Sequence, residues 1–203
     1  MGNILLSGAR VFYAATSATL PSDTTVAYGA AVSAWTGSDA TFKYVGYTNA
    51  PASLAYTSEV YEVMTEQTTQ AVATIVVSES AKVTTALIEW VEANLALAFP
   101  GSSTTAIPAG AGQKAVTQLK AGGSATRNTY LLALEGGIKD AANVTQPVRF
   151  FFYKAQPVLT GDLSMAKNKE AALTLEWTCL NDETKALGQQ LFELHIVTAA
   201  ASS

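Results

Sequence analysis

The sequence predicts a mainly β, mostly antiparallel sandwich or barrel with one α-helix packed on it. Residues 56–101 read as three successive strands followed by a short amphipathic helix. Residues 171–180 alternate apolar and polar side chains, the pattern of a half-buried strand. Charged residues make up only 14% of the chain and hydrophobic residues 49%, so much of the surface is neutral. We therefore expect partner subunits to cover part of that surface.

The N-terminal part predicts one strand and a long connection. Residues 8–15 contain the apolar run Val11-Phe12-Tyr13 and predict the first strand. Residues 16–39, within a region of about 14–40, are rich in Ala, Ser, Thr and Gly and predict a loop or arm. A long loop without secondary structure is uncommon in a compact domain unless it has a function. We expect this arm to cover a neighbouring subunit.

The central part predicts four strands. The first covers residues 41–47, and Asn49-Ala50-Pro51 is expected to break it. The next three are expected at 57–65, 70–78 and 81–87. Both faces of the strand at 70–78 are small or apolar, which is typical of a strand covered on both sides.

A helix is expected over residues 89–99, ended by Pro100-Gly101. Its apolar side chains recur at a spacing of three to four residues, which predicts one buried stripe away from Asn94. The stripe consists of Ile88, Val91, Leu95 and Phe99. We expect it to pack on a sheet.

The C-terminal half predicts a loop and four further strands. The loop covers residues 100–112, and glycines at 121–123 and 136–137 predict further breaks. The strands are expected at 130–135, 148–153, 171–180 and 190–197. The total is nine or ten strands and one helix, in a single domain spanning residues 1–203.

Charge and composition exclude several classes of protein. A net charge of -4 gives no general attraction for nucleic acid. The single cysteine excludes a disulfide-stapled scaffold. The N-terminus does not resemble a signal peptide, and no apolar run is long enough for a membrane-spanning helix. We therefore expect a soluble protein made in a cytoplasm, without a membrane partner.

The sequence offers no convincing catalytic, cofactor or metal site. His195 is the only histidine and Cys179 the only cysteine, whereas zinc normally recruits several such ligands. Cys179 alternates with Trp177 on an apolar strand face, the usual setting of an inert thiol. The glycines at 110–112 precede Lys114, but a phosphate-binding loop needs Gly and Lys adjacent and Ser or Thr after them. We predict no enzyme and no cofactor.

Two further groups of residues attract attention. Glu59, Glu62 and Glu66 are close in sequence, but Glu59 and Glu62 fall on opposite faces of a strand. An electrostatic role, repelling a polyanion, suits them better than acid–base catalysis. Of the tryptophans, Trp90 and Trp177 are expected to anchor the core, whereas Trp35, in the arm, is expected to anchor a subunit interface.

The order of elements resembles the tail tube (major tail) protein of long-tailed bacteriophages. The resemblance covers about residues 35–180 and rests on pattern rather than on one diagnostic motif. In the first half it is carried by Trp35-Thr36, Val45-Gly46-Tyr47-Thr48, 54–63, 76–80, 84–90 and 94–98. In the second half it is carried by Arg149-Phe150-Phe151-Phe152-Tyr153-Lys154-Ala155 and by Gly161-Asp162-Leu163-Ser164 with 171–175.

The resemblance implies a structural virion protein with a tail-tube-like fold. Six subunits would form a ring, and rings would stack into a hollow tube through which phage DNA passes without specific binding. Implied partners are further copies of the chain and the tape measure, terminator and distal tail proteins. Six copies at -4 carry a charge of -24, and an acidic lumen would let a polyanion slide.

Under this resemblance, Glu59, Glu62 and Glu66 are candidates for the lumen or the ring interface. Residues 16–35 and 49–66 are expected to contact other subunits or rings. An alternative from another class is a β-sandwich binding module, such as a phage decoration or receptor-binding domain. That alternative predicts a monomer or small oligomer with one concentrated aromatic patch, whereas a tube subunit distributes its contacts.

Overall fold

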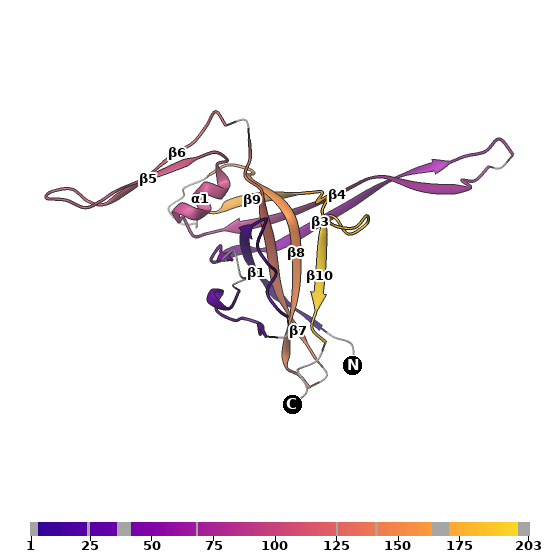
Figure 1. Ribbon diagram of the computed structural model, residues 1–203, viewed down its shortest axis with the longest axis horizontal. Helices are drawn as coiled ribbons and strands as arrows, with labels where there is room; N and C mark the ends of the chain where they lie inside the picture. Colours follow the sequence, from indigo (N-terminus) through magenta and orange to yellow (C-terminus); the bar gives the residue numbers. More distant parts are fainter. Residues whose placement is uncertain are drawn as a thin grey trace.

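The computed structural model describes residues 4–23, 25–35, 42–67, 69–124, 126–140, 142–163 and 171–198, without the side chains of residues 4–7. These residues form ten strands, one α-helix and one short 3-10 helix (Figure 1). The strands are β1 Ile4–Ala15, β2 Lys43–Tyr44, β3 Thr48–Val63, β4 Ala73–Leu87, β5 Ser103–Ile107, β6 Val116–Lys120, β7 Tyr130–Lys139, β8 Thr145–Leu159, β9 Leu173–Leu180 and β10 Phe192–Ile196. The helices are η1 Val32–Ala34 and α1 Glu92–Ala98. The predicted class, mainly β with a single α-helix, is confirmed.

One large antiparallel sheet forms the body of the protein. Its strand order is β2-β1-β7-β8-β9-β4-β3. The long strand β8 pairs with β7 along one edge. Along its other edge, residues 148–152 pair with β10 and residues 154–159 pair with β9. The sheet therefore forks at β8, and β8 is its central strand.

The open sheet curls so that its two end strands, which are consecutive in the chain, come near each other. Only residues 45–47 separate β2 from β3. The Val45 N–H donates to the Val11 carbonyl on β1 at 3.1 Å, and the Tyr47 carbonyl accepts from the Ile88 N–H, just after β4, at 3.1 Å. This connection therefore spans from β1 to the end of β4, and the sheet is rolled into a barrel.

The barrel buries apolar side chains on its inner face and on part of its outer face. The inner core contains residues such as Val83, Leu132, Phe152, Leu175 and Trp177, and α1 adds Leu97 and Ala98. A second core lies on the other face of β1, β7 and β8. It contains Phe12, Ala14, Val26, Trp35, Phe42, Leu131, Ala133, Phe151 and Tyr153. Segments 16–35 and 42–44 cover that second core.

Helix α1 is shorter than the predicted helix at 89–99, and its buried face differs. Leu95 and Phe99 pack on the core as predicted, but Val91 is 48% exposed. The fully buried positions are Asn94, Leu97 and Ala98. The helix begins only at Glu92, and the Asn94 amide donates to the carbonyls of Val45 at 2.8 Å and Glu89 at 2.9 Å. Asn94, which the apolar periodicity placed outside the buried stripe, is therefore buried, and both hydrogen bonds of its amide are made within the protein.

Three predicted breaks are instead parts of strands. Pro51 lies within β3, which tolerates it because β3 is the last strand of the sheet and needs no N–H donor on its outer edge. The predicted strands at 70–78 and 81–87 merge into β4, with a register shift opposite Glu59/Val60. Gly136 and Gly137 lie within β7. At Gly137 a Cβ would approach Thr145 to 2.8 Å, so packing explains this glycine.

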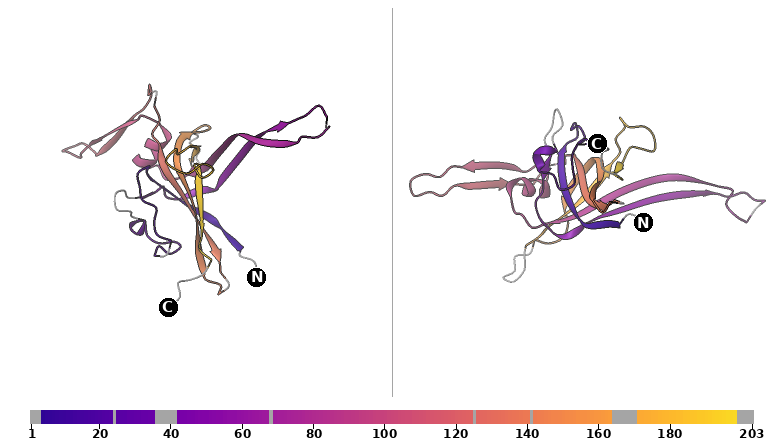
Figure 2. Two further views of the ribbon diagram at one scale, coloured as in Figure 1. Left: turned by 45° about the vertical axis from the view of Figure 1, so that its right-hand side comes forward. Right: turned by 90° about the horizontal axis from the view of Figure 1, so that it is seen from below.

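Two hairpins project from the barrel on opposite sides (Figures 1 and 2). One is the outer half of β3–β4, and the other is β5–β6, whose strands pair only with each other. The β5–β6 hairpin replaces part of the loop predicted at 100–112. Its Thr, Ser and Ala residues suit a strand exposed on both faces as well as they suit a loop.

Strand β4 runs through both the barrel and the hairpin, so the effect of the same Val→Ala substitution on stability can be compared at a buried and an exposed position. We expect Val83→Ala to lower the free energy of unfolding by about 2 kcal/mol, because Val83 is fully buried and two methyl groups leave a cavity. Val76→Ala should change it by less than about 0.5 kcal/mol, because Val76 is 54% exposed. Urea denaturation of both variants measures this difference, and equal losses would contradict the assignment of the core.

Candidate functional site

The N-proximal arm, residues 16–35, packs against its own chain. Trp35 has no exposed surface and stacks on Phe12 with ring centroids 3.9 Å apart. The Arg149 guanidinium lies 5.0 Å from the centroid of the Trp35 ring. Trp35 is therefore a core residue of this chain. An anchor role between subunits, as expected from the sequence, would require the arm to leave this position.

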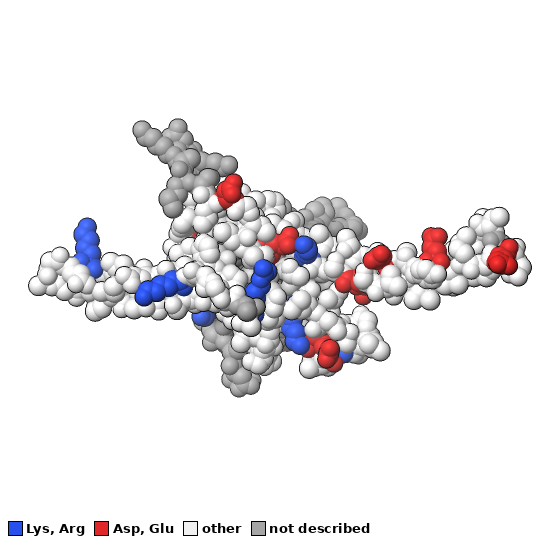
Figure 3. Space-filling model, turned by 90° about the horizontal axis from the view of Figure 1, so that it is seen from above, with Lys and Arg blue, Asp and Glu red and all other residues white. Residues whose placement is uncertain are grey.

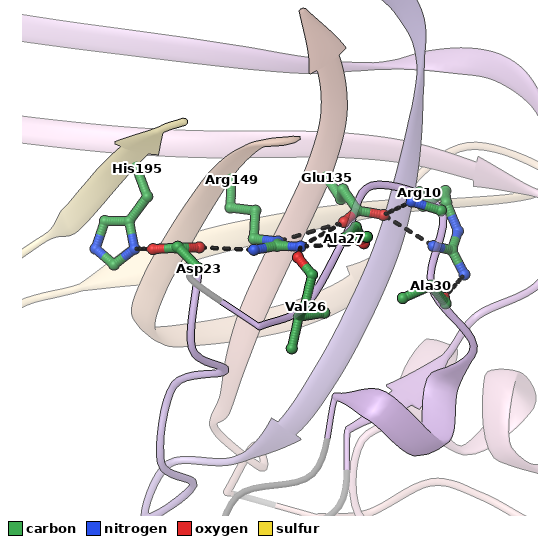
Figure 4. Close-up of polar contacts among 9 residues, drawn as sticks. Arg10, Asp23, Val26, Ala27, Ala30, Glu135, Arg149 and His195 are labelled. Carbon is green, nitrogen blue, oxygen red and sulfur yellow. Dashed lines mark hydrogen bonds and ion pairs between the residues drawn. The ribbon is translucent and has the colours of Figure 1, made fainter. Parts of the chain in front are cut away.

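A line of alternating charges holds the arm to the barrel (Figure 4). Glu135 on β7 and Arg149 on β8 are both fully buried, and the guanidinium donates to the carboxylate at 3.0 Å. Arg149 also donates to Asp23 in the arm at 2.7 Å. Arg10 on β1 donates to the other oxygen of Glu135 at 2.8 Å. Each buried charge thus has a partner of opposite sign, which its burial requires.

The same two arginines also bind the backbone of the arm. Arg149 donates to the carbonyls of Val26 and Ala27, and Arg10 donates to the carbonyl of Ala30 at 2.9 Å. These carbonyls belong to irregular chain without a strand partner, although the Ala27 carbonyl also accepts a backbone hydrogen bond from the Ala30 N–H at 3.2 Å. The arginines therefore supply the hydrogen bonds that a sheet would otherwise provide.

His195 ends this line of charges, between two carboxylates. Its Nδ1 contacts the Asp23 carboxylate, and its Nε2 lies 3.4 Å from the Glu193 carboxylate. In a Ser-His-Asp triad the second ring nitrogen of the histidine faces the hydroxyl of the nucleophile, whereas here it faces a carboxylate. Because both nitrogens face carboxylates, His195 links β10 to the arm. Within the described parts of the chain, no group of three or more His, Cys, Asp and Glu residues could hold a metal ion.

The tryptophans and the cysteine divide between core and surface. Trp177 is buried as predicted, and its indole N–H donates to Thr85 at 3.0 Å. Trp90, also predicted to be a core anchor, is 36% exposed and donates to the Ala171 carbonyl at 2.8 Å. Cys179 lies on the buried face of β9, and burial raises the pKa of its thiol to about 12.

The three predicted glutamates lie on the outer β3–β4 hairpin. Glu59 faces Ser78, whose hydroxyl donates to it at 3.1 Å, and Glu62 pairs with Thr74 on the opposite face. Glu66 lies in the turn region between the strands. Together they place negative charge along the length of the hairpin and on both of its faces.

Sequence reasoning missed a fourth carboxylate on this hairpin. Glu79 lies beside Tyr56, whose hydroxyl donates to it at 2.6 Å. That hydrogen bond raises the pKa of Tyr56. A count of charges by segment could have found Glu79, because residues 51–81 contain four glutamates and no lysine or arginine.

The β3–β4 hairpin also exposes apolar side chains on both faces. Every residue in 53–62 and 71–80 is exposed. The strand predicted at 70–78 to be covered on both sides therefore has no cover from the described part of its own chain. The large apolar side chains that it exposes are Leu54, Tyr56, Val60, Tyr61, Val72, Ile75, Val76 and Val77, with Met64 in the turn.

The opposite hairpin, β5–β6, carries charge of the other sign. Lys114 and Lys120 are exposed on it, and Arg127 follows it. Residues 100–129 contain these three basic residues and no acidic residue. Figure 3 shows the result as blue side chains on one projecting hairpin and red side chains on the other. The contrast is readable from the charges of the two segments, but only the structure shows that both segments are projecting hairpins.

A groove lies at the base of the β3–β4 hairpin. It has a volume of about 490 Å³ and is lined by Tyr56, Glu79, Asn181 and residues 188–192. Its lining contains neither the histidine nor the cysteine of the chain. Separately, no helix in the described parts of the chain is long and apolar enough to span a membrane.

Loss of the buried arginine should destabilise the protein strongly. We expect Arg149→Met to lower the free energy of unfolding by about 3–5 kcal/mol, because Glu135 would keep only Arg10 as a cationic partner. Lys82→Met is the matched control, since it removes the exposed Lys82–Glu176 pair and should cost at most about 1 kcal/mol. Urea denaturation compares the two, and equal costs would show that the buried network does not stabilise the fold.

The Cys179 thiol should be inert in the folded protein. Its raised pKa keeps it protonated at pH 8, and stability should fall as the pH rises above about 8.5, where an unfolded thiol ionises. We expect Ellman's reagent to react at least about 100-fold more slowly with the native protein than with the protein in urea. Ser58→Cys, on the exposed hairpin, is the positive control. Rapid reaction of native Cys179 would contradict its burial.

The comparisons with known proteins agree with this geometry. A family model described as "Phage tail tube protein" matches residues 3–200, and this confirms the resemblance seen in the sequence. A search of curated proteins found no match. Because the family match covers nearly the whole chain, the protein belongs to the phage tail tube family, whose members are structural proteins of the virion tail.

Proposed function

We propose that this chain is the major tail tube subunit, that six copies form a ring, and that rings stack around a lumen that conducts the phage genome into the host. Membership of the tail tube family supports the tube itself. We further propose that residues 1–203 form one domain and that the chain is synthesised in the host cytoplasm. We also propose that the tube contacts the tape measure, terminator and distal tail proteins.

The β3–β4 hairpin is the observation that carries this proposal. Residues 53–62 and 71–80 are exposed on both faces although they include valines, an isoleucine and tyrosines. An isolated two-stranded hairpin is at best marginally stable in water. Exposed apolar surface of this kind marks a site of protein association. In a tube, neighbouring subunits would cover this hairpin and complete its packing.

Charge supports a passage that does not retain DNA. Each copy contributes -4, so a ring of six would carry -24. A wall with an excess of carboxylates repels phosphates and forms few of the contacts that bind DNA by releasing counterions. Glu59, Glu62 and Glu66 are the proposed residues of the lumen or the ring interface. A strongly basic lumen would contradict this part of the proposal.

Electron microscopy of the purified protein tests the proposal. At high concentration the wild-type chain should form hollow tubes or six-membered rings. A variant in which residues 58–79 are replaced by Asn-Gly should stay unassembled, because it lacks the hairpin. Thr57 and Ser80 face each other in register, so a short turn can join them.

The matched control is Glu183→Lys, which changes an exposed charge outside both hairpins and should assemble like the wild type. The truncated chain should keep the urea transition of the barrel, since the removed residues pack on neither core. A wild-type chain that stays a monodisperse monomer under all conditions would overturn the proposal. It would favour the binding-module alternative instead.

A further inference from the structure

We infer that the acidic β3–β4 hairpin of one copy binds the basic β5–β6 hairpin of a second copy, and that this head-to-tail contact propagates the assembly. The inference rests on the proposed function, and it deepens that function by naming the two surfaces that meet. The charges, the direction of the hairpins and their apolar side chains each support it.

The two hairpins separate charge more completely than the rest of the chain does. Residues 51–81 carry four glutamates and no basic residue, a charge of -4. Residues 100–129 carry two lysines and one arginine and no acidic residue, a charge of +3. The whole chain mixes 12 basic with 16 acidic residues. Opposite charges on two surfaces favour their association and disfavour the pairing of either surface with itself.

The hairpins cannot satisfy each other within one molecule. They project in opposite directions from the barrel, as two perpendicular views agree (Figure 2). A contact between them therefore needs a second copy. Because the contact joins different surfaces of two identical chains, each bound pair keeps one free acidic and one free basic hairpin, and the contact repeats.

The neutral parts of both hairpins suit a close contact. Val60 and Val76 pair on one face of the acidic hairpin, and each is more than half exposed. On the basic hairpin Val116 is 47% exposed and pairs with Ile107. Small side chains dominate the remaining positions of the basic hairpin, so the acidic hairpin of a second copy can approach it closely. Burying these valines would add to the electrostatic attraction.

The acidic hairpin is also a candidate for the lumen, and the two roles make different predictions. Repulsion of DNA in a lumen needs the negative charge but needs no basic partner on another copy. A contact between hairpins needs opposite signs and is indifferent to which hairpin carries which sign. Exchanging the charges between the hairpins therefore separates the two roles.

Charge reversal of each hairpin provides the test. Lys114→Glu with Lys120→Glu changes the basic segment from +3 to -1. Glu59→Lys, Glu62→Lys and Glu66→Lys together change the acidic segment from -4 to +2. Each set alone brings like charges together, so we expect the concentration needed for assembly, measured by pelleting, to rise by a factor on the order of 10 or more.

Two combinations should restore assembly. A chain with all five substitutions has its charges exchanged and should assemble close to the wild-type concentration. A mixture of the two singly reversed proteins should co-assemble, because each supplies the sign that the other lacks. Wild-type assembly should also weaken between 0.1 M and 1 M NaCl, where the screening length falls from about 10 Å to about 3 Å.

The controls separate this inference from the proposed function. Lys43→Glu and Glu183→Lys change exposed charges outside both hairpins and should assemble like the wild type. Urea denaturation should show an unchanged barrel in every variant. If the wild-type chain forms no tubes, the proposed function fails. If it forms tubes and the reversed hairpins assemble normally, or neither combination restores assembly, only the contact between hairpins is refuted.

Discussion

The buried ion pair between Arg149 and Glu135 is the interaction on which the arrangement of this chain depends. Neither charge can be buried alone, because an unpaired ion loses its hydration without compensation. Their burial requires the arm to supply Asp23 and three backbone carbonyls, and β1 to supply Arg10. The arm in turn covers the apolar outer face of β1, β7 and β8. Electrostatics and packing thus place the same segment over the same strands.

The barrel and the hairpins follow different physical rules. The barrel buries its apolar side chains within its own chain, in an inner core and in an outer core beneath the arm. The outer β3–β4 hairpin continues two barrel strands but leaves their apolar side chains in solvent. Trp177 is completely buried and stabilises the fold, whereas Val76 and Val77 are exposed on the hairpin, where they are free to contact other chains. That division is what a subunit of a polymer requires.

Sequence reasoning succeeded where a local pattern and the tertiary structure agree. The alternation in β9 gave the predicted half-buried strand, because one of its faces lies on a core. The apolar run in β1 gave the predicted strand, and both of its faces lie on a core. The sequence-based predictions were wrong where the surroundings of a residue, rather than its local pattern, decide its structure or burial. Pro51 is tolerated only because β3 lies at the sheet edge, and Asn94 is buried only because two carbonyls accept from its amide. The β5–β6 hairpin has small polar side chains on exposed strands, so its pattern does not differ from that of a loop.

By itself, the sequence determined the mainly β class, the single helix, the family resemblance and the absence of a recognisable catalytic motif, because these depend on composition and on spacing along the chain. Only the tertiary structure decided where the charges and the arm lie. Arg10, Asp23, Glu135, Arg149 and His195 come from five separate segments, and no local pattern relates them. The acidic and the basic hairpin likewise lie on opposite sides of the barrel because of the way the sheet is rolled (Figure 2). The number of residues between two segments does not determine the direction in which each one projects.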